Sequence, residues 1–161
     1  MTRRRPRHEV SRSTPIAAAA EEVWARVTTI EGINHELGPW MRMTAPRTLR
    51  GATIDDLPVG ERAGRSWILL FGLIPFDYDD LRLVEREPGR FLERSTMLSM
   101  SLWEHERTVR ATGDGGSEIT DRMAFELRPP LAALGLARPI RAMIARLVAH
   151  RHRRLAEHFS S

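Results

Sequence analysis

Two segments of the chain, residues 103–109 and 119–125, have the alternation expected of the paired strands of one β-hairpin. The register that matches them best pairs Trp103 with Phe125, His105 with Met123, Arg107 with Asp121 and Val109 with Ile119. On the other face of the hairpin, the same register pairs residues of opposite charge or two threonines. These pairs are Glu106 with Arg122, Thr108 with Thr120 and Arg110 with Glu118. A shift of one residue would destroy both sets, since side chains alternate between the two faces of a strand.

The inward face of this hairpin mixes large apolar side chains with ionisable ones. A plain hydrophobic core would not contain His105, Arg107 and Asp121, because burying charged groups costs free energy unless they are paired. We therefore interpret this face as one wall of a ligand-binding cavity. The sequence leaves open which ligand binds there and whether the cavity is catalytic.

The length of 161 residues and the composition predict a single domain, residues 8–161, preceded by a basic tail, residues 1–7. The chain has no cysteine, which favours a cytoplasmic protein without disulfides. Its longest apolar run, residues 67–76, is far shorter than the ~20 residues of a membrane span. Lysine is absent and all 25 basic residues are arginine, but the net charge is only +4. We interpret this as compositional bias and expect no specific nucleic-acid partner.

Periodicity predicts an α+β domain with a strongly curved antiparallel sheet. The expected strands cover residues 8–16, 40–46, 64–71, 76–87 and 90–98, together with the two strands of the hairpin. Two short helices are expected at residues 17–28 and 30–37. A long C-terminal helix is expected from Pro139 to Phe159, because proline is favoured at the first helical position.

The order of these elements resembles the START, polyketide-cyclase and birch-pollen-allergen (SRPBCC) superfamily over almost the whole chain. The motifs that carry the resemblance are Ile16-x-Ala18-x-x-Glu21-x-Val23-Trp24, Pro58-Val59-Gly60, Trp103-x-His105, Asp121-Arg122 followed by Phe125, and Arg151-His152. The chain departs from many relatives in having Ala19 where they open the first helix with proline. The resemblance implies a helix-grip fold, with the C-terminal helix packed across a seven-stranded sheet and a cavity for a hydrophobic or amphipathic molecule between them. It does not imply catalysis, because the superfamily includes carriers and sensors as well as cyclases.

Arg107 and Asp121 have two interpretations. They could hold or polarise a ligand, with the arginine contacting a carboxylate or carbonyl group. They could equally form a structural ion pair that touches no ligand, which alone explains why both are present. His105 is a candidate general acid or base, although a half-buried histidine is more often simply hydrogen-bonded. His150 and His152 are two residues apart on a helix and so point in different directions. We expect no metal site and no cofactor.

Apolar candidates for the cavity lining come from both the hairpin and the C-terminal helix. They are Trp103, Met123, Phe125, Met143 and Leu147, each of which could also be ordinary core. Arg151 lies near the centre of the apolar stripe of the helix. It is expected either to reach into the cavity or to lie in solvent beyond the sheet.

Three hypotheses follow. The first is a carrier or sensor that binds a small lipid-like or polyketide-like molecule without catalysis. The second is a polyketide cyclase or dehydratase, in which Arg107 stabilises an enolate and His105 moves a proton. The third is a peripheral module that contacts membranes or nucleic acid through the arginines within residues 3–7 and through Arg151, Arg153 and Arg154. Under the first hypothesis a transient membrane contact during ligand pickup is also conceivable. The oligomeric state and the cavity volume do not follow from the sequence.

Overall fold

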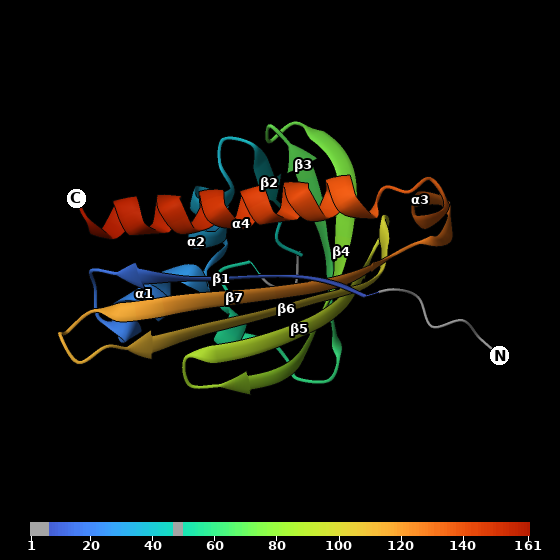
Figure 1. Ribbon diagram of the computed structural model, residues 1–161. Helices are drawn as coiled ribbons and strands as arrows, with labels where there is room; N and C mark the ends of the chain where they lie inside the picture. Colours follow the sequence, from blue (N-terminus) through green and yellow to red (C-terminus); the bar gives the residue numbers. More distant parts are fainter. Residues whose placement is uncertain (1–6, 47–49) are drawn as a thin grey trace.

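The protein is described by a computed structural model that covers residues 7–46 and 50–161 (Figure 1). Seven strands form one antiparallel sheet in the order β1-β7-β6-β5-β4-β3-β2. The strands are β1 (His8–Ile16), β2 (Met41–Met43), β3 (Arg62–Leu70), β4 (Ile74–Glu87), β5 (Arg90–Met97), β6 (Met100–Ala111) and β7 (Ser117–Leu127). The seven-stranded helix-grip architecture is therefore confirmed. Of the basic tail proposed at residues 1–7, residues 1–6 lie outside the described part of the chain.

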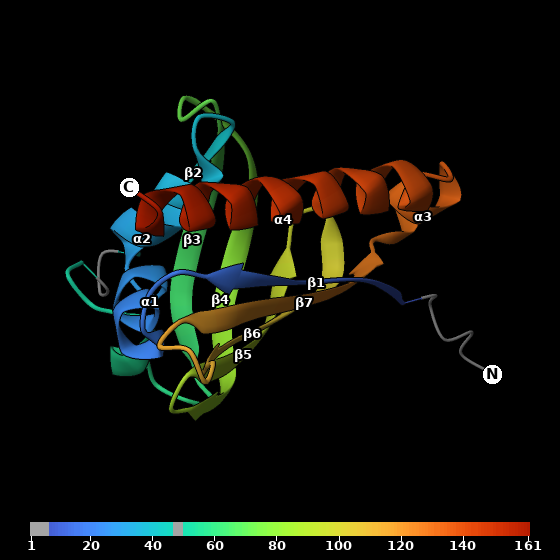
Figure 2. The same ribbon diagram turned by 60° about the vertical axis from the view of Figure 1, so that its left-hand side comes forward.

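Four α-helices accompany the sheet: α1 (Ala20–Val27), α2 (Ile30–Leu37), α3 (Pro129–Ala133) and α4 (Ala137–Phe159). The 3₁₀ turn η2 covers Ile54–Asp56. Figures 1 and 2 show α4 running across the concave side of the curved sheet, with α1 and α2 at the end where the chain terminates. Within the described residues, no helix is both long enough and apolar enough to span a membrane.

The hairpin of β6 and β7 has the predicted register. Trp103 pairs with Phe125, His105 with Met123, Arg107 with Asp121 and Val109 with Ile119. In the connecting loop, Gly115 adopts a positive φ of 84°, which glycine tolerates without steric cost. The amide of Gly116 donates a hydrogen bond of 3.1 Å to the side chain of Asp114, which stabilises the loop.

Several element boundaries differ from the prediction. Helix α1 begins at Ala20 instead of residue 17, because Ala19 keeps an extended backbone as the N-cap residue. Strand β2 covers only three residues of the expected 40–46. Helix α4 begins at Ala137, two residues before Pro139, which is tolerated because the first-turn amides have no partner within a helix. The short helix α3 was not predicted.

Gly32 fixes how closely α1 and α2 approach each other. A Cβ atom at this position would lie 1.9 Å from the carbonyl oxygen of Arg26, so only glycine fits without moving one of the helices. The close approach sets the position of α2 at one end of the sheet. Helix α2 in turn contacts α4 and β2, and this placement brings Glu36 into the interior.

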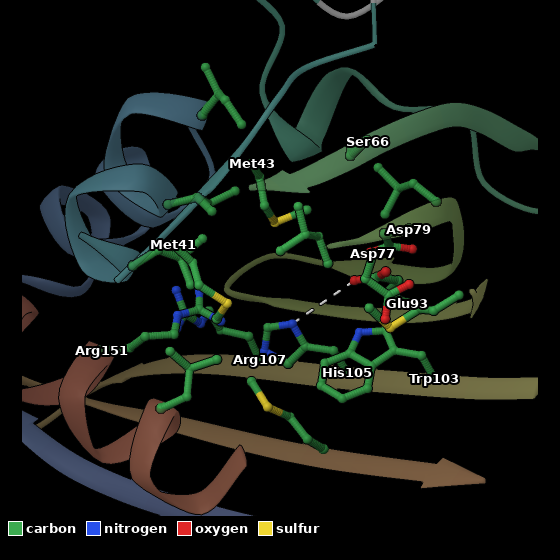
Figure 3. Close-up of a pocket in the computed structure, with 18 of the residues that line it drawn as sticks. Met41, Met43, Ser66, Asp77, Asp79, Glu93, Trp103, His105, Arg107 and Arg151 are labelled. Carbon is green, nitrogen blue, oxygen red and sulfur yellow. Dashed lines mark ion pairs between the residues drawn. The ribbon is translucent and has the colours of Figure 1, made fainter. Parts of the chain in front are cut away.

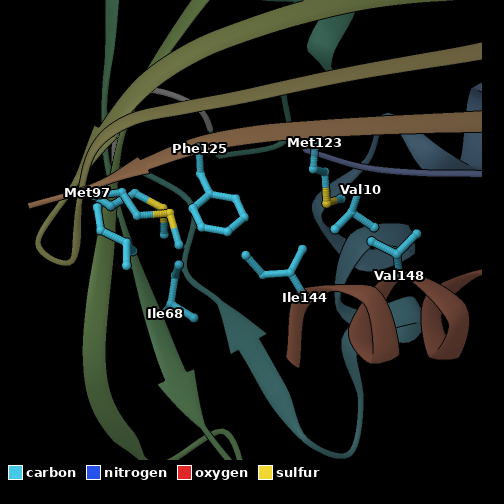
Figure 4. Packing of buried hydrophobic residues seen from close by; sticks show 9 residues of the cluster. Val10, Ile68, Met97, Met123, Phe125, Ile144 and Val148 are labelled. Carbon is cyan, nitrogen blue, oxygen red and sulfur yellow. The ribbon is translucent and has the colours of Figure 1, made fainter. Parts of the chain in front are cut away.

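The hydrophobic core fills the space between the sheet and α4 (Figure 4). Phe125 and Met123 from β7 meet Ile144 and Val148 from α4, and all four are at least 97% buried. A second cluster combines residues of α1, β1, β6, β7 and the end of α4, namely Ile16, Val23, Val27, Val109, Ile119 and Leu155. A third, smaller cluster is formed by Leu57, Leu83 and Phe91.

Candidate functional site

A cavity of about 330 Å³ lies between the concave face of the sheet and helices α2 and α4. Its volume is at the lower end of the ~300–1,000 Å³ typical of small-molecule sites. Most of its lining is apolar, with Ile33, Met41 and Ile68 on one side and Ile144 and Leu147 on α4. Phe76 and Met143 also line the cavity, and they are 43% and 54% exposed. The cavity therefore opens to solvent between β4 and α4.

The structure brings most of the candidate residues to this cavity. Trp103, His105, Arg107, Met123, Met143, Leu147 and Arg151 all line it. Asp121 and Phe125, in contrast, are completely buried behind the cavity wall. A ligand in the cavity would therefore meet the side chain of Arg107 but not its partner Asp121.

Arg107 is held by two carboxylates. Its Nε and Nη2 atoms donate to the two oxygens of Asp121 at 2.8 and 2.7 Å, and its Nη1 and Nη2 atoms donate to the two oxygens of Glu36 at 2.8 and 2.9 Å. Both contacts are bidentate, the geometry in which a guanidinium group binds carboxylates most strongly. The side chain is 1% exposed. Four of its five N–H groups are thus already used inside the protein.

Asp121 is also hydrogen-bonded to two histidines. Nε2 of His105 lies 2.8 Å from Oδ1, and Nε2 of His152 lies 2.9 Å from Oδ2. Burial by itself would raise the pKa of Asp121, but the charge and hydrogen bonds of Arg107, assisted by His105, hold it well below its usual range. Asp121 is therefore a permanent anion at the centre of this network.

Glu36 and Arg151 complete the network from the helices. Arg151 Nε and Nη2 both lie 3.0 Å from Oε2 of Glu36, and Arg151 is only 8% exposed, so it reaches into the protein instead of lying in solvent. Burial opposes the charge of Glu36, yet Arg107 and Arg151 lower its pKa. We refer to Glu36, His105, Arg107, Asp121, Arg151 and His152 as the ion network. Its two carboxylates balance its two guanidinium groups.

A second group of ionisable side chains borders the same cavity at the other end. Figure 3 shows Asp77 and Asp79 from β4 and Glu93 from β5 gathered above Trp103 and His105, away from Arg107 and Arg151. All three carboxyl groups are buried, with exposures of 3–6%. We refer to Asp77, Asp79 and Glu93 as the acidic cluster. Among the described residues no arginine forms an ion pair with any of the three, and His105 Nδ1 is 4.0 Å from Glu93 Oε2.

The partners of the acidic cluster are mostly neutral donors. Asp77 accepts hydrogen bonds from the backbone amides of Tyr78 and Leu98, both at 2.8 Å, and from the hydroxyl group of Ser99. Glu93 accepts one from Ser95 at 2.8 Å. Oδ1 of Asp79 has no hydrogen-bond partner in the described part of the chain. Burial, and then the neighbouring charge of Glu93, raise the pKa of Asp79 well above its usual value.

The sequence contains signals for Glu36 and for the aspartates of the acidic cluster, although neither was among the predicted site residues. Glu36 lies three residues after Ile33 and next to Leu37, on the apolar stripe of α2. Asp77 and Asp79 share the parity of Leu81 and Leu83 along β4, so the alternation of the strand predicts that they face inward. A carboxylate on an otherwise apolar face would have identified each of them.

A family profile described as "Domain of unknown function (DUF8410)" matches residues 14–159, which is nearly the whole chain. The chain belongs to the DUF8410 family. No curated protein matches this DUF8410 member in sequence. The family description gives the domain without assigning it a ligand or a reaction.

Solved structures similar to this DUF8410 protein identify its fold. A START superfamily protein from Mycobacterium smegmatis has a TM-score of 0.68 at 10% identity, over 95% of this chain and 97% of the other. The Zhui aromatase/cyclase from Streptomyces sp. R1128 has a TM-score of 0.66 at 13% identity, over 96% and 94%. Ara h 8.0201 has a TM-score of 0.59 at 10% identity, over 96% and 98%. The resemblance to the SRPBCC superfamily is thereby confirmed at the level of the fold.

Proposed function

We propose that the protein binds a small hydrophobic or amphipathic molecule in the cavity between the sheet and α4, as a carrier or sensor. The observation that carries this proposal is the mainly apolar cavity of about 330 Å³, which is open to solvent beside Phe76 and Met143 and has polar groups at its inner end. Burying an aliphatic chain there would contribute ~0.8 kcal/mol for each methylene group. The polar groups would hold the head of the molecule.

The surface arginines support this function over binding to nucleic acid or an anionic membrane. Glu104 pairs with Arg7, Arg94 and Arg122 at 2.5–3.0 Å, and Asp80 pairs with Arg62 and Arg65 at 2.7–3.0 Å. Each of these five arginines therefore has an acidic partner, although Glu104 is shared by three of them and Asp80 by two. A surface that binds phosphate groups keeps its cations available to them.

Native mass spectrometry of the gently purified protein tests the proposal. We expect a bound small molecule that is released by organic solvent, and we expect the stripped protein to take up members of a panel of fatty acids, alcohols, amines and sterols. Replacing Leu147 by Trp would fill the cavity from α4 and should reduce uptake. A protein that carries no small molecule and binds nothing in the panel would contradict the proposal.

A second candidate function is an enzyme that moves a proton at a carbon atom next to a carbonyl group. The position of His105 favours it, because Asp121 fixes Nε2 at 2.8 Å while Nδ1 is directed toward Glu93 and the cavity. A carboxylate that orients a histidine in this way is typical of a general base. Arg107 is less suited to stabilising an enolate, since two internal carboxylates already occupy it.

Exchange of the α-protons of 2-decanone in deuterated buffer, followed by NMR, tests the enzymatic candidate. We expect the wild-type protein to accelerate exchange, and His105→Gln to return the rate to that of buffer while ketone binding remains. Arg94→Ala, on the outer surface, is the matched control and should leave the rate unchanged. Exchange that is equally fast in His105→Gln, or no faster with protein than without it, would contradict catalysis by His105.

A further inference from the structure

The acidic cluster presents an unsatisfied acceptor to the cavity. Asp79 is 97% buried, lines the cavity and has an Oδ1 atom without any hydrogen-bond partner in the described residues. A buried acceptor without a donor is costly, because it has lost its hydrogen bonds to water. A bound molecule that brings a donor to this atom would recover that cost.

The charge balance of the cavity decides what kind of donor fits. In the ion network two guanidinium groups match two carboxylates, whereas Asp77, Asp79 and Glu93 have no arginine partner in the described part of the chain. A ligand carboxylate placed beside them would find carboxyl oxygens and no cation, and Arg107 has no free bidentate edge to offer it. A cationic group would instead be attracted by the carboxylates and by the π face of Trp103, which lies beside them in Figure 3.

We propose that the acidic cluster recognises an aliphatic amine, so that the molecule bound in the cavity is a cationic amphiphile whose ammonium head donates to Asp79 and Glu93. This inference rests on the proposed ligand-binding function and specifies its ligand class. An ammonium group offers three donors and suits a site with several acceptors. The alternative of a metal ion is disfavoured, since no group of three His, Asp or Glu side chains in residues 7–46 and 50–161 has an arrangement that could hold one.

Three probes with the same ten-carbon chain test the inference, namely decylamine, 1-decanol and decanoate. Each is titrated calorimetrically into protein stripped of bound molecules. We expect decylamine to bind at least about tenfold more tightly than decanol, and decanoate to bind most weakly, as expected for a charge-assisted contact at a buried carboxylate. The net charge of +4 would attract decanoate non-specifically, so an amine preference cannot arise from the overall charge.

Substitutions in the acidic cluster test whether it is the source of the preference for decylamine. Asp79→Asn, and independently Glu93→Gln, should remove most of the advantage of decylamine while leaving decanol binding unchanged. Asp80→Asn removes one negative charge from the next residue of β4, where Asp80 faces Arg62 and Arg65, and should keep the preference intact. Circular dichroism and thermal unfolding verify that each variant is folded.

The outcomes separate this inference from the function on which it rests. Equal binding of all three probes, tighter binding of decanoate, or an amine preference that survives in both Asp79→Asn and Glu93→Gln would overturn amine recognition and leave ligand binding intact. Failure of every probe to bind the stripped wild-type protein would count against the ligand-binding function itself, and the inference would fall with it.

Discussion

The ion network and the acidic cluster border the same cavity but differ in how their charges are compensated. In the ion network, Glu36 and Asp121 each receive bidentate hydrogen bonds from Arg107, and Arg151 adds a further contact to Glu36. In the acidic cluster, backbone amides and serine hydroxyls supply the donors, and one oxygen of Asp79 has none in the described residues. The carboxylates of the ion network therefore find their hydrogen-bond donors within the protein, while the acidic cluster lacks a donor for one oxygen.

This difference separates a structural role from a binding role. Buried charges that satisfy one another gain nothing from a ligand, and breaking such a group leaves the remaining charges unpaired. A buried group that lacks a partner destabilises the folded protein and becomes satisfied only when a ligand supplies one. We therefore assign the stability of the cavity wall to the ion network and its selectivity to the acidic cluster.

Removal of the central cation should have the largest effect. Arg107→Ala removes the bidentate partner of both buried carboxylates and leaves Glu36 with Arg151 and Asp121 with two histidines, so we expect the free energy of unfolding to fall by about 3 kcal/mol. Urea denaturation monitored by tryptophan fluorescence measures the loss. The matched control is Arg94→Ala on the neighbouring strand β5, where the ion pair to Glu104 is half exposed and should contribute less than about 1 kcal/mol.

The same pair of variants can contradict the assignment. If Arg107→Ala unfolds at nearly the same urea concentration as Arg94→Ala but loses ligand affinity, then Arg107 serves binding and not structure. The ion network would then belong with the acidic cluster, and the proposed division between the two regions would be wrong.

The fold followed from the sequence because its determinants are local or repeat at a fixed period. The β6–β7 register was predictable from pairs such as Arg107 with Asp121, since complementarity on both faces excludes a shifted alignment. The limits of β2 and α1 were not predictable in the same way. They depend on where neighbouring elements pack, as at Ala19, whose extended backbone delays the start of the helix.

The hairpin residues of the site could also be predicted from the sequence. Glu36 and the acidic cluster could not, for a physical reason. The hairpin showed Arg107 and Asp121 facing each other, but the third partner, Glu36, lies 71 residues away from Arg107 on α2. Such a contact is fixed only by tertiary packing. The acidic cluster joins Asp79 and Glu93 across two strands whose pairing has a bulge between Leu83 and Glu85, so their encounter could not be derived from a simple register.

A substitution in the acidic cluster should change the free energy of unfolding less than Arg107→Ala does, and in the opposite direction. The pKa of Asp79 is raised in the folded protein, so the folded state holds this proton more tightly than the unfolded state does. Its contribution to stability is therefore fully present below the unfolded pKa of about 3.9 and is lost as the pH rises through the folded pKa. Asp79→Asn removes the cost of ionising this buried carboxyl group, and we expect it to stabilise the protein more at pH 7 than at pH 4.

The pH dependence distinguishes Asp79 from both the ion network and its own neighbour. Glu36 and Asp121 have lowered pKa values, so their contribution is present above about pH 4 and lost as the pH falls, equally in the wild type and in Asp79→Asn. The difference in unfolding free energy between the wild type and Asp79→Asn, followed upward from about pH 4, therefore isolates Asp79. Asp80, whose pKa is lowered by its hydrogen bond to Arg65, provides the control, because Asp80→Asn should destabilise slightly where Asp79→Asn stabilises. A loss of stability in Asp79→Asn at neutral pH would mean that its carboxylate is already satisfied inside the protein, and the acidic cluster would then be as complete as the ion network.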